Sequence, residues 1–452
     1  MKKTTGIVLL LAAALGAFVY FYDLKHTKPS PINGDLDVES SETADANAKP
    51  AFTLSPSDVT SLTILRNGTS ATFEKRPDGY YMTQPLATKA DESTVGAIAS
   101  ELSSERVVRT ITATPEQLST FGLANPAVTL QFGVQNGTKH TLKLGNKDFS
   151  GFNVYAIIDG SKDVSILSNT ILTSSDKPVD DFRDQSMMHF QPNDATSFDL
   201  KNESGEILAT KRDSTWKLEK PRAAAADGPA ISSFLDLIST ARVASFVDDA
   251  SNDLSKYGLS KPGINLRIDL AGGKTTELKV GKKDASAYFA KVTSEPFVFR
   301  VTEATYKTLS DKFFDLRDKQ LVHVGDSDAA RLDIRNGTLT ASCVKGADGE
   351  WTAASSADSK SKPTNCPSMW GSLKDARAQE IYDAPPATIS AQLAKPAVEV
   401  ALTEKSGKKI EVRISSASGN SVYARTSDAP AIFKLDKQIL ADLNPAGTSV
   451  HD

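Results

Sequence analysis

Short runs in which apolar and polar residues alternate occupy much of the chain from residue 53 onward. Three of them come first, at Val59 to Leu65, Thr72 to Lys75 and Gly79 to Thr83. The pair Asn67-Gly68 separates the first two runs. Alternation with a period of two predicts half-buried strands, and Asn-Gly between two such runs predicts a tight hairpin. We therefore expect a sheet that begins with short antiparallel strands.

Helical spacing follows each opening group of strands. In the first group, apolar residues recur three and four positions apart, at Val95, Ile98, Ala99 and Leu102. Residues with this spacing share one face of a helix. Comparable segments run from Pro229 to Ala241 and from Ser368 to Ala378. Each helix is expected to cover one face of a sheet.

The whole pattern repeats along the chain. Phe121-Gly122-Leu123 returns as Tyr257-Gly258-Leu259, at an offset of 258 − 122 = 136, and a proline follows each leucine by three residues. A fainter third copy has Leu393 followed by Pro396. This period is far longer than the roughly 20 to 50 residues of solenoid repeats, so it predicts tandem domains. The predicted domains span residues 53–190, 191–325 and 326–452, the last truncated at its end.

Each predicted domain mixes strands and helices in the same order. Strands come first, then a helix, a turn, a hairpin with a short strand, and in the first two copies a closing strand and helix. Tight hairpins require antiparallel pairing. The predicted fold class is α+β, with three tandem strand-rich repeat domains whose antiparallel sheets have helices packed on one face, after an N-terminal transmembrane helix.

An aromatic residue opens each repeat, at Tyr80, Trp216 and Trp351. These side chains could line a ligand groove. Equal placement in all three repeats instead favours a role in the core, where aromatic residues bury a large apolar area.

Two repeats share a motif at their ends, Phe182-Arg183-Asp184 and Leu316-Arg317-Asp318, at an offset of 317 − 183 = 134. One interpretation is structural: each arginine caps the final helix, or ties one repeat to the next by pairing with a carboxylate. The alternative is that Arg183, Asp184, Arg317 and Asp318 contact a partner protein.

The overall charge excludes one class of partner. The formal net charge is −4, with 52 basic and 56 acidic residues. Binding of nucleic acid requires a basic face that neutralises phosphates. We therefore expect no nucleic acid partner.

The N-terminus predicts membrane attachment. Lys2 and Lys3 precede an uncharged run from Thr4 to Tyr22, which has about the 20 residues that a spanning helix needs. Residues 1–22 are thus predicted to be a single-pass anchor and residues 23–52 a flexible polar linker. The flanking lysines predict that the N-terminus lies in the cytoplasm and that the bulk of the chain lies on the far side of the membrane. A cleaved signal peptide is the alternative.

The two cysteines, Cys343 and Cys366, both fall in the third repeat. In an oxidising compartment such a pair predicts a disulfide that closes a loop. Two free thiols are the alternative.

Known catalytic motifs are absent from the sequence. The five histidines have no second ligand at metal spacing, and neither a Gly-x-Ser-x-Gly elbow nor His-Glu-x-x-His occurs. We expect a protein that is not an enzyme and that has no cofactor, metal or catalytic site.

The order of these motifs resembles a known family. Tyr257-Gly258-Leu259, Pro262, Gly281 and Leu316-Arg317-Asp318 carry the likeness most clearly. They are similar to the motifs of bacterial membrane-anchored repeat proteins built on a domain of unknown function, which are often associated with ABC-type export systems resembling gliding-motility transporters. The resemblance implies an extracytoplasmic accessory or scaffold subunit whose partners are ABC transporter subunits. A periplasmic module that binds a lipid or glycan is the alternative, and an envelope hydrolase a third hypothesis.

Overall fold

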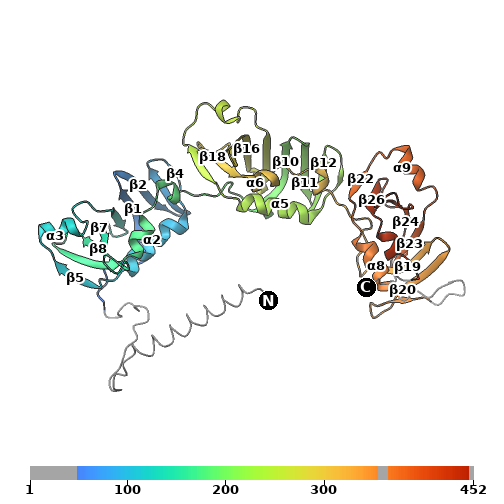
Figure 1. Cartoon of the computed structure of the whole chain (residues 1–452), viewed down its shortest axis with the longest axis horizontal. Coiled ribbons are helices and arrows are strands. Elements are labelled where there is room, and N and C mark those ends of the chain that lie inside the picture. The colour runs from blue at the N-terminus through green and yellow to red at the C-terminus, as the bar shows by residue number, and fades with distance from the viewer. Residues whose placement is uncertain (1–47, 355–364, 447–452) are drawn as a thin grey trace, which may run out of the picture. The chain divides into compact units, whose positions relative to one another are not determined.

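The computed structural model describes residues 48–354 and 365–446. It consists of two compact units, one ending at Phe182 and the other beginning at Arg183. The first unit contains one sheet and the second contains two (Figure 1). The predicted anchor and most of the predicted linker lie outside the described residues. In the part of the chain that is described, no helix has both the length and the apolar character needed to cross a bilayer.

The first sheet is antiparallel throughout, with the strand order β4-β3-β2-β1-β6-β7-β8-β9-β5. Its strands are β1 (Val59–Arg66), β2 (Thr69–Arg76), β3 (Gly79–Gln84), β4 (Thr88–Lys89), β5 (Arg109–Thr112), β6 (Val128–Val134), β7 (Lys139–Lys147), β8 (Asn153–Ile158) and β9 (Asp163–Ser168). The helical segments are η1 (Pro56–Asp58), α2 (Glu92–Ser104), α3 (Pro115–Thr120), α4 (Thr170–Ser175) and η2 (Val179–Phe182).

The second sheet has the same order, β13-β12-β11-β10-β15-β16-β17-β18-β14. Its strands are β10 (Ala195–Asn202), β11 (Gly205–Arg212), β12 (Thr215–Lys220), β13 (Ala224–Ala225), β14 (Ser245–Asp248), β15 (Ile264–Leu270), β16 (Thr275–Asp284), β17 (Ala287–Val292) and β18 (Val298–Thr302). The helical segments are η3 (Pro192–Asp194), α5 (Gly228–Thr240), η4 (Ser255–Tyr257), η5 (Ala271–Gly273), α6 (Glu303–Thr308) and α7 (Phe313–Leu316).

The third sheet follows the order β21-β20-β19-β23-β24-β25-β26-β22. Its strands are β19 (Ala329–Asn336), β20 (Leu339–Lys345), β21 (Trp351–Ala353), β22 (Glu380–Tyr382), β23 (Val398–Glu404), β24 (Lys409–Ile414), β25 (Ser421–Thr426) and β26 (Ile432–Asp436). The helices are α8 (Cys366–Asp375), α9 (Ala387–Gln392) and α10 (Ile439–Asp442). The prediction of three strand-rich repeats with antiparallel sheets is confirmed.

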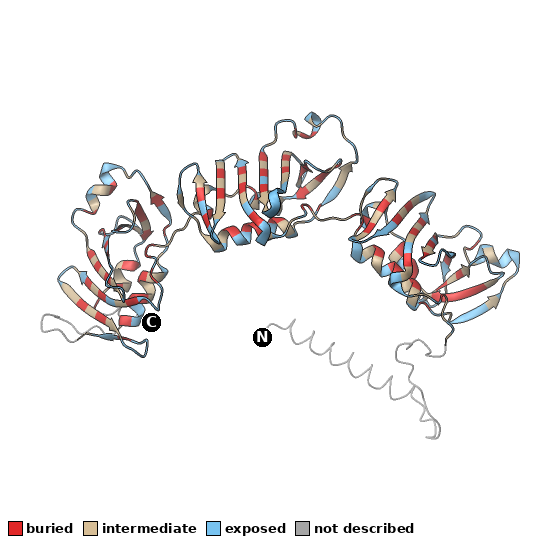
Figure 2. Ribbon diagram, turned by 180° about the vertical axis from the view of Figure 1, so that it is seen from behind, coloured by how far each residue is buried: buried red, intermediate tan, exposed pale blue. Residues whose placement is uncertain are grey.

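A helix contributes its apolar face to the core of each domain. In the second domain Ile231, Phe234 and Ile238 of α5 belong to the same buried cluster as the inward residues of the sheet. Figure 2 shows buried and exposed positions alternating along the strands. Fully burying one such side chain contributes about 1.5–3 kcal/mol, so the α5 face contributes several kcal/mol to the stability of the domain. Asp227 starts this helix by accepting a hydrogen bond from Ala230 N at 3.0 Å.

The opening aromatics lie in these cores. Tyr80, Trp216 and Trp351 are all buried, one in each core cluster. The ring centroid of Trp216 lies 5.9 Å from that of Phe198, which is 5.2 Å from that of Phe234 on α5. Side chains therefore fill the space between sheet and helix in the second domain.

The domain boundaries lie earlier than the sequence suggested. The second unit begins at Arg183 rather than 191, and its first core includes Met187 and Met188. The core of the third domain likewise includes Leu321, ahead of the predicted boundary at 326. Both boundaries lie earlier for the same reason. The segment that precedes each sheet supplies residues to the core, although apolar and polar residues do not alternate along it.

The described end of the predicted linker is also part of a domain. Ala51 N donates to Glu105 O at 2.9 Å, and Val107 N donates to Lys49 O at 2.9 Å. Phe52 is buried in the first core. The predicted linker, 23–52, thus extends too far into the first domain, because backbone pairing orders its last residues.

Candidate interaction surface on the open faces of the sheets

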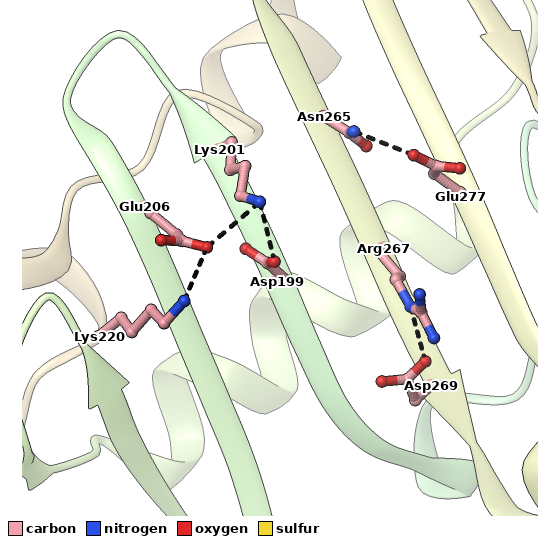
Figure 3. A network of polar contacts seen from close by, with 8 residues as sticks. All are labelled: Asp199, Lys201, Glu206, Lys220, Asn265, Arg267, Asp269 and Glu277. Carbon is pink, nitrogen blue, oxygen red and sulfur yellow. Dashed lines mark hydrogen bonds and ion pairs between the residues drawn. The ribbon is translucent and has the colours of Figure 1, made fainter.

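The second sheet turns charged side chains away from its core. Figure 3 shows seven of them and one amide, Asn265, on β10, β11, β12, β15 and β16, with the helix on the other side of the sheet. They are Asp199, Lys201, Glu206, Lys220, Asn265, Arg267, Asp269 and Glu277. Strand alternation places them on one face, since every second residue points the same way.

These side chains pair with one another across neighbouring strands. Lys201 Nζ lies 3.4 Å from Asp199 Oδ2 and 3.2 Å from Glu206 Oε1, and Lys220 Nζ also lies 3.2 Å from Glu206 Oε1. Hydrogen bonds from Lys220 and Lys201 lower the pKa of the Glu206 carboxyl. The two lysines balance the two carboxylates, and the side chains are open to solvent. Each ion pair therefore contributes little free energy, and a charged group of a partner can take the place of either member.

The third sheet has a groove on the corresponding face. The groove has a volume of about 380 Å³ and is formed by β19, β20, β23 and β24. Its lining residues are Asp333, Ile334, Arg335, Thr340, Ala341, Ser342, Glu399, Val400, Ala401, Glu411, Val412 and Arg413. We refer to it as the β19–β24 groove.

One carboxylate of the groove is firmly held. Arg331 Nε donates to Asp333 Oδ2 at 2.8 Å, and Ser342 Oγ donates to Asp333 Oδ1 at 2.5 Å. Partial burial alone would raise the pKa of Asp333, but the bonds from Arg331 and Ser342 outweigh it and lower that pKa. Asp333 therefore stays ionised at neutral pH.

Other charges of the groove are loosely paired. Arg335 pairs with Glu399, and Arg413 lies 4.0 Å from Glu399 and 3.8 Å from Glu411. The side chains of Arg335, Arg413 and Glu411 are more than half exposed. Exposed pairs contribute about 0–1 kcal/mol, so a ligand of matching charge can displace them at little cost.

The first sheet differs on the equivalent face. Asp199 and Asp333 correspond to Thr63, at offsets of 199 − 63 = 136 and 333 − 199 = 134. Thr63 pairs with Thr72 in register, and their hydroxyl oxygens lie 3.3 Å apart. The repeats thus share a fold but not the chemistry of this face.

The side chains of Arg183 and Arg317 both pair within the domain that follows. The backbone of Arg317 still bridges to Ala226 of the preceding sheet, so Arg317 ties the second repeat to the third, as the structural interpretation expected. Arg183 Nη1 lies 2.7 Å from Asp249 Oδ1, and its guanidinium lies 3.5 Å from the ring centroid of Phe246. Arg317 makes a bidentate pair with Asp383, at 2.7 and 2.6 Å. Arg183 is 1% exposed and so has no surface for a partner protein, whereas the partner contact at Asp184, Arg317 and Asp318 stays a prediction.

The aspartates of this motif hold the start of the next domain. Asp184 Oδ1 accepts a hydrogen bond from Ser186 N at 2.8 Å, and Asp318 Oδ1 accepts one from Gln320 N at 2.8 Å. Each aspartate also faces a histidine five residues later, His189 at 3.6 Å and His323 at 2.5 Å. The bond with Asp318 raises the pKa of His323. This repeated Asp–His spacing was present in the sequence and the prediction missed it.

Cys343 and Cys366 form a disulfide with a Cα–Cα distance of 5.8 Å. It joins β20 to the first residue of α8. Residues 355–364, between the two cysteines, lie outside the described part of the chain.

Histidine and carboxylate groups do not gather into a metal site in the described ranges. His140 Nδ1 lies 2.8 Å from Asp159 Oδ2, beside an open depression that also includes Lys139 and Lys143. Across residues 48–354 and 365–446 no three histidine, cysteine or acidic side chains are placed to hold an ion.

Comparison with known proteins supplies the family. The family model described as "Domain of unknown function (DUF4340)" matches residues 81–217 and 216–391. The first match runs from just after one opening aromatic, Tyr80, to the next, Trp216. The second begins at Trp216 and continues past β21, α8 and β22 into α9 of the third domain. A search of curated proteins finds no match.

Proposed function

Because the chain belongs to the DUF4340 family, whose two matches together span residues 81–391, we propose that it is a non-enzymatic binding protein that presents the open faces of its sheets to partner proteins. The observation that carries the proposal is the β19–β24 groove, with its exposed and loosely paired charges of both signs. A protein segment with complementary charges can replace these pairs, which favours specific recognition over tight burial.

A protein partner suits this surface better than a small apolar ligand. The groove lies on the outer face of a sheet, and charged and hydroxyl side chains line much of it. Small-molecule sites are mostly apolar and enclose their ligand. The lipid- or glycan-binding alternative needs space between sheet and helix, where the second domain packs Phe198, Trp216 and Phe234.

The specific form of the proposal is an extracytoplasmic accessory or scaffold subunit of an ABC-type export system, held in the bacterial inner membrane by one N-terminal span. The apolar run from Thr4 to Tyr22 behind Lys2 and Lys3 supports membrane attachment. The resemblance to membrane-anchored proteins of export systems supports the choice of partner.

Site-specific photo-crosslinking in native membranes tests the proposal. A photoreactive residue at Ala401, inside the groove, is compared with one at Gln131, the same position in the first sheet. We expect protein adducts at 401 and few at 131, with export-system subunits among them for the specific form. Equal adducts at both positions, or none at 401, would contradict the proposal, and adducts with lipid or glycan alone would favour the alternative.

Charge reversal supplies a matched pair of variants. Arg413→Glu changes a groove charge, and Lys143→Glu changes the equivalent position of the first sheet. The adducts at 401 should fall about tenfold with Arg413→Glu, which corresponds to the loss of one charge-assisted contact. They should not change with Lys143→Glu.

A further inference from the structure

A loop of the first domain exposes two phenylalanines. Phe149 is fully exposed and Phe152 is 75% exposed, and both lie in the segment 148–152 between β7 and β8. Most other phenylalanines of the described chain, such as Phe73 and Phe182, are buried in cores. Exposed apolar side chains that cluster mark a surface that contacts something else.

Polar contacts hold this loop in shape. Asp148 Oδ1 accepts hydrogen bonds from Ser150 Oγ at 2.6 Å and Gly151 N at 3.0 Å, and Asp148 Oδ2 accepts one from Asn153 Nδ2 at 3.0 Å. Gly151 supplies the positive φ of 76° that the turn requires. The two phenylalanines are therefore displayed by a formed loop and do not help to form it.

The other two domains have no aromatic at this position. In the second domain the turn between β16 and β17 is Ala285-Ser286, and in the third the loop 415–420 between β24 and β25 consists of small and polar residues. The aromatic pair thus occurs only in the domain that directly follows the N-terminal segment.

The loop lies at the end of the sheet where the chain enters the first domain. Asn169 N donates to Phe152 O at 2.8 Å, and Val108 N donates to Ile166 O at 2.9 Å. These contacts bring together the ends of β8, β9 and β5. Because Val107 also bonds to Lys49 O, the entering chain reaches the same end. Val108, half-exposed, adds a third apolar side chain there.

Basic side chains surround this end. Lys49, Arg106, Arg109 and Lys147 are exposed, and no ion pair joins any of them to a carboxylate within the described residues. Of the nearby acids, Glu105 is buried. The Asp148 carboxylate keeps its charge but accepts hydrogen bonds within the loop, and the four basic side chains outnumber it. Exposed aromatic side chains with basic side chains around them suit the interface of an anionic bilayer. There, aromatic rings lie at the level of the headgroups and basic side chains pair with the lipid phosphates.

We propose that Phe149 and Phe152 insert into the interfacial layer of the anionic membrane to which the N-terminal segment attaches the protein, so that the first domain rests on the bilayer. The inference rests on the proposed membrane attachment. Only 47 − 23 + 1 = 25 residues separate the apolar run from the first described residue. As the polar linker that the sequence predicts, a segment of that length would have a root-mean-square span of about 25–30 Å, which would keep the loop within reach of the surface.

Fluorescence quenching by lipid tests the inference on the full chain. Phe149→Trp is reconstituted in phosphatidylglycerol vesicles whose lipids carry bromine near the headgroup, and Ala417→Trp in the loop of the third domain is the matched control. The signal of the three native tryptophans, present in both, is subtracted. We expect a blue-shifted emission and loss of most of the fluorescence at 149, with neither effect at 417. Phe152→Trp serves as a second probe and should behave as Phe149→Trp does.

Flotation of the same vesicles separates two kinds of failure. Protein that floats with the vesicles while the probes at 149 and 152 stay unquenched would overturn the inference and leave the membrane attachment intact. Protein that does not float would overturn the attachment and the inference with it. Equal quenching at 149 and 417 would show general adsorption to lipid and would also overturn insertion by this loop.

Discussion

Arg183 and Asp249 lie 66 residues apart in sequence and 2.7 Å apart in space. Arg317 and Asp383 repeat the relationship with the same separation of 66 residues. In the first repeat the corresponding positions are Asn47 and Ala113, by the offset of 136. The arginine–aspartate pair therefore occurs in the two domains that follow another domain, and it secures the first residues of each.

Replacement of Arg183 should destabilise the second domain through lost packing more than through lost charge. The guanidinium is buried against Phe246 and Phe297, whereas Asp249 is 56% exposed. Arg183→Ala is expected to cost about 2–4 kcal/mol of unfolding free energy, as for a buried side chain that leaves a cavity. Asp249→Asn should cost about 1 kcal/mol. Native-state hydrogen exchange of α5 measures both, and equal losses would show that the charge pair dominates.

Glu105 should make the first domain more stable at acid pH than at alkaline pH. Burial raises the pKa of this carboxyl to about 7, although hydrogen bonds from Ser168 N and from the Arg106 backbone lower it in part. The folded state thus holds a proton that the unfolded state releases near pH 4.3. The stabilisation is complete below that pH and is lost as the pH rises through about 7.

Glu105→Gln should remove this dependence, because the amide is neutral and its oxygen can still accept from Ser168 N. At pH 8 the variant is expected to be about 2–3 kcal/mol more stable than the natural protein, and at pH 4 nearly equal to it. Hydrogen exchange of α2 at the two pH values measures the difference. A natural protein whose first domain gains stability between pH 5 and 8 would contradict this assignment.

Loss of the disulfide should weaken the third domain alone. Cys343 and Cys366 are 23 residues apart, and closing a loop of that length contributes about 3 kcal/mol in the chain-entropy account. The double variant Cys343→Ser/Cys366→Ser is expected to lose that amount. Native-state hydrogen exchange of α8 reports the change, and exchange of α2 in the first domain should stay the same. The first domain, which has no cysteine, is the internal control.

Gly281 should not tolerate a side chain, whereas its counterpart in the third repeat already has one. A Cβ at Gly281 would lie 2.1 Å from Tyr257 O, and at Gly145 it would lie 2.2 Å from Phe121 O. These carbonyls belong to the turns at Gly122 and Gly258, both with positive φ. The third repeat lacks this Gly-Leu turn and has the buried Ser415 instead.

The two positions should therefore respond differently to alanine. Gly281→Ala is expected to cost about 1–3 kcal/mol or more, because backbone must move. Ser415→Ala should cost about 1–2 kcal/mol, since it loses the bond from Tyr423 N to Ser415 Oγ at 3.0 Å and the bond that Ser415 Oγ donates to Ser416 O at 2.8 Å, with no backbone movement. Thermal unfolding of the two variants compares them, and a neutral Gly281→Ala would refute the close approach.

Local pattern was sufficient to predict the repeats, the hairpins and the helix faces. The turn at Asn67-Gly68 and the spacing of Ile231, Phe234 and Ile238 depend on neighbours a few residues away, so the chain itself specifies them. The aromatics Trp216 and Trp351 could be placed in cores for a related reason, because repetition at equal positions reflects a shared packing role.

Tertiary structure alone decided what depends on distant partners. Arg183 belongs to the second domain because its side chain contacts Asp249 and Phe246. Neither contact can be predicted from the residues beside the arginine in the sequence. The β19–β24 groove joins β19 and β20 to β23 and β24, which are separated in sequence by the two edge strands β21 and β22 and by the helices α8 and α9. The exposure of Phe149 could not be predicted from the sequence either. Burial depends on whether the fold brings other side chains over a residue, and the apolar character of the residue does not determine that.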